Sequence, residues 1–269
     1  MTGAAGRIGA VLREGLRGRY AALRLLDVED LGTARDGEEL VTADLRDYAR
    51  VEAAAEGVDA VVHLGAIPGE AAFADICEHN LVGTYHVFEA ARRQGVQRVV
   101  YASSNHATGF YPVSERIGPD APVRPDSYYG VSKVFGEALG RLYVDKFAMQ
   151  VACLRIGSFR ERPTSRRELS TWLSHRDAVD LVRCCLDAPA LGFAIVYGLS
   201  ANTRSWWDNP EADRIGYRPA DDAESFAGEV AANDDHPTEP TDSLQGGPFA
   251  AREATAGQPH GVPPVSGGA

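Results

Sequence analysis

A tyrosine and a lysine four residues apart, Tyr129 and Lys133, are the side chains best suited to chemistry in this sequence. On a helix this spacing places both side chains on one face, about one turn apart. An ammonium group at that distance favours the phenolate. We therefore expect Lys133 to lower the pKa of Tyr129 from its reference value of about 10 and to make it a usable base. The alternative is a surface contact, the commoner role of such a pair.

A polar run, residues 103–106, directly follows an apolar stretch at residues 97–102. The run consists of Ser103, Ser104, Asn105 and His106. The apolar stretch is typical of a buried strand, and ligands bind beyond the carboxyl ends of parallel strands. A polar turn that caps a helix would explain the same residues. Because Tyr129 and Lys133 follow on the next expected helix, we favour a functional role.

The chain opens with glycines at positions 3, 6 and 9, ahead of an apolar, helix-like run. Such glycines allow the backbone to approach a pyrophosphate, and the N-terminus of the next helix offers free N–H groups to it. Residues 22–26 are typical of a strand and end at Asp27, where this fingerprint places a carboxylate to hold a ribose 2′-hydroxyl. Asp27 would repel a 2′-phosphate, so the sequence favours NAD over NADP.

The strand that should precede this glycine turn is not evident, because no apolar run stands before Thr2. We expect the sequence as written to lack the first strand of its sheet, through a GTG valine codon inside that strand being taken as the initiator and written as Met1. In-frame apolar codons upstream would support this hypothesis. Without the strand, both folding and NAD binding are in question.

The remaining segments alternate between strand-like and helical patterns. Strands are expected at residues 39–45, 58–67, 97–102, 151–157 and 193–197, and helices at 46–57, 73–94 and around Tyr129. This alternation predicts an α/β fold with a Rossmann-like, doubly wound parallel sheet. In such a fold one crevice at the carboxyl ends of the strands brings together the glycine turn, residues 65–68 and residues 103–106. We interpret His63, inside an apolar run, as a core residue without a chemical role.

Composition narrows the function class. A formal net charge of −11 and a pI of about 5.1 argue against a nucleic-acid or anionic-membrane partner, and no apolar run approaches the length of a membrane span. The four cysteines lack the paired spacing of a zinc site, so we expect reduced core thiols and no metal. We expect a cytoplasmic protein.

Together these motifs resemble the extended short-chain dehydrogenases/reductases of the NAD-dependent epimerase/dehydratase superfamily, and most closely the uronate dehydrogenases. The superfamily resemblance rests on the three glycines, Asp27, Asp44-Leu45, Ser104 and the Tyr129/Lys133 pair. The closer resemblance rests on longer matching sequence segments, at residues 102–106, 129–133, 169–175, 205–209 and 245–247.

The resemblance implies NAD-dependent oxidation of a hexuronate, such as galacturonate or glucuronate, at C1 to the aldarolactone. Tyr129 would take the hydroxyl proton, Lys133 would tune Tyr129 and hold the nicotinamide ribose, and Ser104 would orient the reacting oxygen. Asn105 and His106 would contact the sugar hydroxyls. The implied cofactor-binding residues are Gly3, Gly6, Arg7, Ile8, Gly9, Asp27, Asp44, Leu45, Gly65 and Lys133.

A uronate carboxylate calls for a bidentate guanidinium, and Arg167 occupies the matching position. Its neighbours Arg160, Arg162 and Arg166 would add an electropositive patch, although charge clusters are often only solvated. Pro68 stands where the resemblance leads us to expect a serine, so one sugar contact is expected to be lost.

We expect a dinucleotide-binding region at residues 1–157, a small substrate lobe at 158–230 and a Pro/Gly-rich tail at 231–269 that is mobile or lies over the protein surface. Trp206 and Trp207 are expected to be core anchors. We also expect a homo-oligomer. Two alternatives stay open, a nucleotide-sugar epimerase or dehydratase and a non-catalytic NAD-binding protein.

Overall fold

The computed structural model describes residues 1–233 and 240–251. Its centre is a set of parallel strands. β1 (Leu23–Asp27) pairs with β2 (Glu38–Thr42), while β3 (Ala60–His63), β4 (Arg98–Ser104), β5 (Gln150–Ile156) and β8 (Phe193–Gly198) pair in that order. Thr2 lies between the two groups and forms parallel bridges to Leu26 and His63. The expected α/β fold with a parallel sheet is confirmed.

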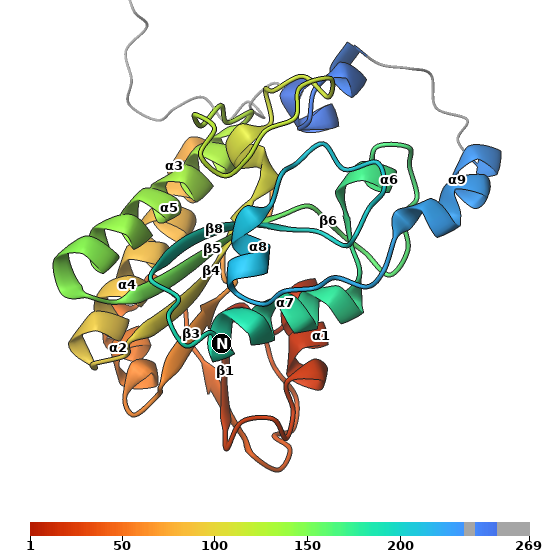
Figure 1. Ribbon diagram of the computed structural model, residues 1–269. Coiled ribbons are helices and arrows are strands. Elements are labelled where there is room, and N and C mark those ends of the chain that lie inside the picture. Colours follow the sequence, from red (N-terminus) through yellow and green to blue (C-terminus); the bar gives the residue numbers. More distant parts are fainter. Residues whose placement is uncertain (234–239, 252–269) are drawn as a thin grey trace, which may run out of the picture.

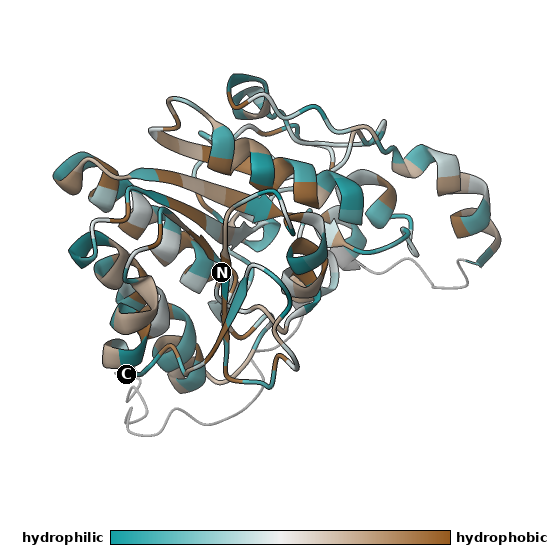
Figure 2. Ribbon diagram, turned by 90° about the horizontal axis from the view of Figure 1, so that it is seen from below, coloured by the Kyte–Doolittle hydropathy of each residue, from teal (hydrophilic) through white to brown (hydrophobic). Residues whose placement is uncertain are grey.

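Helices cover both faces of these strands (Figure 1). On one face lie α1 (Arg7–Gly15) and α7 (His175–Asp187), and on the other α2 (Tyr48–Ala55), α4 (Gly83–Arg93) and α5 (Tyr128–Phe147). Two apolar clusters fill the spaces between strands and helices. The strands are accordingly hydrophobic along much of their length (Figure 2), as expected for a sheet buried on both faces.

The other elements are short. α3 (Phe73–Asp75) continues into a π-helix, η1 (Ile76–Val82), and then into α4; η2 (Asn105–Thr108) follows β4. β6 (Ser158–Phe159) pairs with β7 (Trp172–Leu173) beside α6 (Glu168–Thr171). The C-terminal part contains α8 (Pro210–Arg214), η3 (Ala223–Phe226), α9 (Ala227–Asn233), η4 (Pro240–Ser243) and η5 (Gly247–Ala251).

Several elements differ in length from the sequence-based expectation. The expected strand at 39–45 ends at Thr42 and the expected helix at 46–57 begins at Tyr48, because two aspartates shape the connection. The side chain of Asp44 accepts from the Arg46 amide, and Asp47 caps α2 by accepting from Arg50. The strand expected at 58–67 is confined to β3, whereas the strand expected at 97–102 continues through Ser104.

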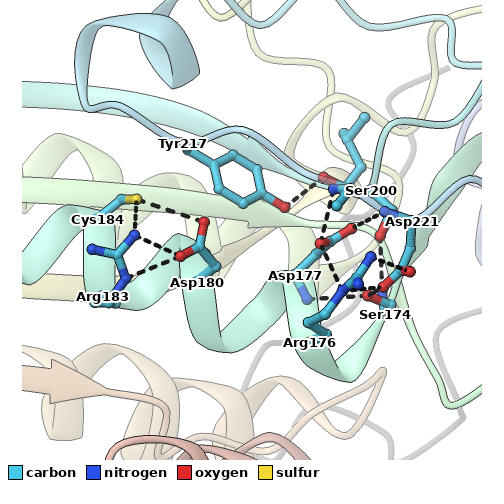
Figure 3. A network of polar contacts seen from close by, with 11 residues as sticks. Ser174, Arg176, Asp177, Asp180, Arg183, Cys184, Ser200, Tyr217 and Asp221 are labelled. Carbon is cyan, nitrogen blue, oxygen red and sulfur yellow. Dashed lines mark hydrogen bonds and ion pairs between the residues drawn. The ribbon is translucent and has the colours of Figure 1, made fainter. Parts of the chain in front are cut away.

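A polar network ties the segment before η3 to the start of α7 (Figure 3). Ser174 caps α7 by accepting from the Asp177 amide at 3.1 Å, and its hydroxyl donates to Asp221 at 2.6 Å. Asp177 in turn accepts from the backbone amides of Ala220 and Asp221, both at 3.0 Å. The C-terminal part of the chain is thereby fastened to the layer that covers the main sheet.

The boundary at residue 158 stays a prediction. Within residues 158–230, α7 and β8 join the main sheet layers, whereas β6, β7 and α6 form a smaller part beside them. Of the two alternatives expected for the tail, residues 244–249 follow the second: they are not mobile but pack against the protein, with Gln245 fully buried. The rest of that expectation, at 234–239 and 252–269, lies outside the described residues.

Within the described ranges, no helix combines the length and apolar character needed to cross a membrane.

Candidate active site

The glycine turn packs so closely that side chains are excluded from it. Gly3 has a φ of 68°, and a Cβ at this position would lie 2.6 Å from the Gly65 nitrogen. A Cβ on Gly9 would lie 2.3 Å from the Gly3 oxygen. α1 begins directly after Gly6, which provides no side-chain cap, and its first turn holds no acidic residue. Backbone N–H groups at the start of α1, with Arg7 and Ile8 beside them, suit an anionic pyrophosphate.

A carboxylate stands beside this turn at the end of β1. Asp27 accepts from the Ala5 amide at 2.8 Å and from the Val28 amide at 2.8 Å. Asp44 binds Arg46, and that hydrogen bond lowers the pKa of Asp44 to about 2. The backbone oxygen of Leu45 is bonded to His86, while the Leu45 side chain lies against Gly65. Of the expected cofactor-binding residues outside the turn, Asp27, Gly65 and Leu45 lie close to it, an arrangement that fits a dinucleotide.

Tyr129 is fixed by the first turn of α5. Ser127 caps the helix by accepting from the Gly130 amide at 3.0 Å. The carboxylate of Glu70 accepts from the amides of Tyr128 and Tyr129 at 3.2 and 3.0 Å. Ser104, the last residue of β4, lies beside the Tyr129 hydroxyl and acts to lower its pKa, against the larger opposite effect of burial. The structure thus brings Ser104 and Tyr129 together as expected.

Lys133 lies one turn further along α5, buried to 4% exposure, with its Nζ 5.3 Å from the ring centres of both Tyr129 and Tyr101. Burial lowers the pKa of Lys133 to about 7 and raises the pKa of Tyr129 to about 12. The expectation that Lys133 lowers the tyrosine pKa is therefore wrong for the protein without ligands. Desolvation disfavours the charged form of each group.

The loop after β3 is tied to α5 through Asn80 of the π-helix. The Asn80 amide accepts from the Ile67 nitrogen at 2.8 Å, donates to the Ile67 oxygen at 3.1 Å and donates to Ser132 Oγ at 3.1 Å. Ser132 itself donates to the backbone oxygen of Tyr129 at 2.6 Å. These bonds place the loop that contains Pro68 against the helix that carries Tyr129. π-Helical segments often occur at such functional positions.

His63 has the core role expected from the sequence. Its side chain is 1% exposed, and its ring nitrogens lie 2.7 Å from Thr2 Oγ1 and 3.1 Å from Thr84 Oγ1. Burial lowers the pKa of His63 to about 3, so the ring is neutral at physiological pH.

His106 faces Tyr129 from η2. Its Nδ1 lies 2.7 Å from Asp126 Oδ2, and its ring makes an edge contact with the ring of Tyr129 at 6.0 Å between centres. The ring of Phe249 stacks on His106 at 4.0 Å. Since Asp126 engages Nδ1, the imidazole Nε2 is the ring nitrogen left for a further hydrogen bond.

Arg167 is held by uncharged atoms. Its Nε and Nη2 donate to the backbone oxygen of Gln245 at 3.1 and 2.5 Å, and its Nη1 lies 3.4 Å from Ser158 Oγ. With the Asn105 amide nitrogen donating to the Ile156 oxygen, the Asn105 side-chain oxygen accepts from Arg167 Nη2 at 2.9 Å. Burial lowers the pKa of Arg167 from its usual value, which indicates a cation short of solvation.

The wider electropositive patch expected around Arg167 needs correction. Arg160 pairs with Glu168 at 2.5 Å, and Arg162 lies 4.0 Å from Glu229. Acidic partners brought in by folding thus neutralise two of the four arginines, whereas Arg167 points inward. It is the arginine of this group that adjoins Asn105 and the end of β4.

Sequence reasoning missed four residues that shape the site: Glu70, Asp126, Gln245 and Phe249. Gln245 is fully buried. Its amide accepts from Trp207 Nε1 at 2.7 Å and donates to the backbone oxygens of Pro112 and Glu115 at 3.2 and 2.8 Å. The segment at residues 245–247, which contributed to the closer resemblance, was the one sequence signal that pointed to this part of the chain. No group of acidic, histidine or cysteine side chains in the described residues could hold a metal ion.

Comparison with known proteins adds three findings. Residues 1–190 match the model of the NAD dependent epimerase/dehydratase family. The chain is 46% identical over 252 residues, 93% of this chain and 94% of the relative, to a uronate dehydrogenase of Pseudomonas putida. It is 47% identical to a uronate dehydrogenase of Agrobacterium fabrum, with 93% of this chain and 95% of that protein covered.

A solved structure is similar over nearly the same range. A mutant of the uronate dehydrogenase from Agrobacterium tumefaciens, complexed with NAD, shares 45% identity and a TM-score of 0.91. The likeness covers 94% of this chain and 96% of that one. The arrangement of strands and helices is therefore common to both.

Proposed function

The chain belongs to the NAD-dependent epimerase/dehydratase family, and from this membership and its site we propose that it is a uronate dehydrogenase. It oxidises a hexuronate at C1 with NAD as the hydride acceptor and releases the aldarolactone. Uronate dehydrogenases that are 46 and 47% identical over 93% of the chain support this activity.

The observation that carries the substrate class is Arg167. Its guanidinium is partly buried, and its hydrogen-bond partners in the described part of the chain are a carbonyl, a hydroxyl and an amide oxygen. The charges of Asp126, Glu168 and Asp242 act on the guanidinium and offset part of the cost of burial, but none of these carboxylates is among its hydrogen-bond partners in the described residues. An anionic substrate would supply a hydrogen-bonded negative charge to the guanidinium, whose planar donors match the two oxygens of a carboxylate. A hexuronate differs from a hexose by that carboxylate.

In the proposed reaction, Tyr129 accepts the proton of the C1 hydroxyl while hydride leaves C1 for the nicotinamide, the one step that NAD itself supplies. Ser104 holds the reacting oxygen beside the Tyr129 hydroxyl, a role supported by the proximity of the two side chains. Lys133, whose Nζ lies 5.3 Å from the centre of the Tyr129 ring, would hold the nicotinamide ribose. Asn105 and His106 bind sugar hydroxyls, and Asp126 orients His106.

The raised pKa of Tyr129 has a consequence for this step. In the unliganded protein the phenol is neutral at physiological pH, because burial holds its pKa at about 12. Positive charge brought beside Tyr129 would favour the phenolate. We propose that the glycine turn, Asp27 and Lys133 would hold NAD, and that the positive charge of its oxidised nicotinamide would favour the Tyr129 phenolate.

NADH formation tests the function directly. Galacturonate and glucuronate, each with NAD, should yield NADH measured by its absorbance, and Tyr129→Phe should abolish turnover while NAD affinity stays within about twofold, since the substitution removes only the base. A folded protein that binds NAD but forms no NADH from either uronate would refute the assignment. Conversion of a nucleotide sugar without net NADH would identify an epimerase instead.

We also propose a homo-oligomer. Exposed apolar side chains gather on α3, α4 and α5, which lie on the same side of the molecule (Figure 1), and they include Phe73, Tyr85, Val131, Leu142 and Phe147. Such a surface is typical of a protein interface. Light scattering coupled to size exclusion checks this, and a monomer at micromolar concentration would contradict it. A cytoplasmic location stays a prediction.

A further inference from the structure

Gln245 is a fully buried side chain at which distant parts of the chain meet. Its amide oxygen accepts from Trp207 Nε1 at 2.7 Å, and its amide nitrogen donates to the backbone oxygens of Pro112 and Glu115 at 3.2 and 2.8 Å. An indole N–H only donates and a carbonyl only accepts, so the amide has a single orientation. The backbone nitrogen of Gln245 also donates to the Tyr111 oxygen at 2.8 Å. Side chain and backbone are therefore both fixed at this position.

The two residues that follow Gln245 lie against two groups of the candidate site. A Cβ on Gly246 would lie 1.9 Å from Asp126 Oδ2, the oxygen that the His106 ring contacts. Gly247 has a φ of 58°, and a Cβ there would lie 2.7 Å from the Cδ of Arg167. Only glycine fits at these two positions, so residues 245–247 are built for this close approach.

The backbone oxygen of Gln245 occupies one edge of the Arg167 guanidinium. It accepts from Nε at 3.1 Å and from Nη2 at 2.5 Å. The Asn105 side-chain oxygen accepts from the same Nη2 at 2.9 Å. The one contact of Nη1 among the described residues is to Ser158 Oγ at 3.4 Å, so Nη1 keeps an N–H group that no described residue takes. Gln245 thus sets the direction in which the remaining donor points.

Every residue has a backbone oxygen, so the Gln245 side chain matters through where it places that oxygen. A methionine at position 245 has a similar volume but lacks the amide hydrogens that bind the Pro112 and Glu115 oxygens, and its thioether is only a weak acceptor for Trp207. The backbone oxygen would then shift relative to the Arg167 guanidinium. A displacement of about 1 Å at a site that positions a substrate lowers the rate by up to about 100-fold.

We propose that Gln245 is a positioning residue for the carboxylate site: its buried side chain fixes the backbone oxygen that orients Arg167, and so contributes to the preference for a uronate over the corresponding uncharged hexose. The substrate in this inference rests on the proposed function. Gln245 acts through Arg167 and takes no part in hydride or proton transfer. Carboxylate recognition then depends on a side chain 78 residues away in the sequence, anchored to the segments that follow β4 and β8.

Gln245→Met tests the proposal, because it keeps the volume and removes the amide. The ratio of kcat/KM for galacturonate to that for galactose should fall about tenfold, mainly through a higher KM for galacturonate. NAD affinity should stay within about twofold, since none of the Gln245 bonds involves the glycine turn. An unchanged ratio in a folded Gln245→Met protein would overturn the proposal.

A double-mutant cycle with Arg167→Ala separates positioning from a general structural role. Because Gln245 is proposed to act through the guanidinium, Gln245→Met should change the ratio by less than about twofold once Arg167 is alanine. Fold-changes that multiply in the double variant would show that Gln245 acts by another route, and the proposal would fall.

Two neighbouring tryptophans provide milder variants in case Gln245→Met does not fold. Trp207→Phe keeps an aromatic ring on Tyr197, against which Trp207 stacks at 5.0 Å, but removes the N–H that Gln245 accepts. It should lower the ratio about threefold. Trp206→Phe is the matched control, because the buried Trp206 Nε1 has no hydrogen-bond partner in the described residues, and it should leave the ratio unchanged. Equal ratios in the two variants would count decisively against the proposal.

Hydrogen exchange at Arg167 Nε, followed by NMR, needs no turnover. The bond to the Gln245 oxygen should slow this exchange in the unsubstituted protein, and Gln245→Met should speed it by at least about tenfold. If the unsubstituted protein forms no NADH from either uronate, the proposed function is refuted, and this exchange rate alone decides whether Gln245 positions Arg167. Equal exchange rates in the two proteins would refute the positioning role.

Discussion

Removal of the Arg167 guanidinium should convert the enzyme from a uronate dehydrogenase into one that no longer distinguishes uronates from hexoses. Charge-assisted hydrogen bonds contribute about 1.5–3 kcal/mol each, so Arg167→Ala should lower kcat/KM for galacturonate by about 10- to 150-fold. Galactose has no carboxylate, so its kcat/KM should change little. The ratio of the two values should fall by the same 10- to 150-fold.

The same substitution should also reduce stability. Arg167 donates twice to the backbone oxygen of Gln245, a residue that is fully buried, and alanine would leave this acceptor unpaired. An unpaired buried acceptor costs about 1–3 kcal/mol, which corresponds to a fall of about 2–10 °C in the unfolding midpoint. Arg167→Lys keeps the charge but not the planar fork, so we expect it to restore the specificity ratio only in part.

Initial rates of NADH formation with both sugars, at saturating NAD, measure these effects. Arg162→Ala is the matched control, because that side chain is 62% exposed and lies 4.0 Å from Glu229 at the surface. It should change neither the ratio nor the midpoint. A galacturonate-to-galactose ratio that is unchanged in Arg167→Ala would refute the role of Arg167 in carboxylate recognition.

Three further predictions concern the turn, the helix that carries Tyr129 and the core histidine. Gly3→Ala should weaken NAD binding, measured by calorimetry, at least about tenfold, because its Cβ would lie 2.6 Å from the Gly65 nitrogen. Gly18 also has a positive φ but lies in open space, so Gly18→Ala should cost only about 1 kcal/mol of stability. Equal NAD affinities in the two variants would contradict this. Glu70→Gln should lower kcat several-fold with little change in the KM for NAD, since the carboxylate binds two amides at the start of α5; a change in KM for NAD alone would count against it. His63 has a pKa of about 3 when folded against 6.5 normally, so the unfolded chain binds more protons between these pH values. Its contribution to stability is complete above pH 6.5 and is lost as the pH falls toward 3, with a slope of up to about 1.4 kcal/mol per pH unit that His63→Gln should remove in urea titrations.

The sequence located most of the framework because the responsible signals are local. Spacing of three residues identifies the glycine turn, apolar runs identify β1, β3, β4, β5 and β8, and a four-residue spacing places Tyr129 and Lys133 on one helix face. Element ends were less well predicted, since they depend on single caps such as Asp47 and on the π-helix inside the segment 73–94. Periodicity does not distinguish a π-helical turn from an α-helical one.

Electrostatics was predicted less well than position. From the sequence, Lys133 lies near Tyr129, and attraction between unlike charges favours a lower tyrosine pKa. Folding buries both groups, so desolvation lowers the pKa of Lys133 to about 7 and raises that of Tyr129 to about 12. Whether the tyrosine pKa rises or falls depends on how deeply the pair is buried. The four-residue spacing does not reveal that burial.

By itself, the sequence determined the α/β class, the glycine turn, the acidic end of β1 and the serine, tyrosine and lysine of the proposed reaction. Only the tertiary structure decided that Gln245, 78 residues after Arg167, holds the guanidinium, and that Phe249 covers His106. Helix and strand patterns arise from neighbours along the chain, whereas these contacts join residues far apart in sequence and exist only once the chain has packed.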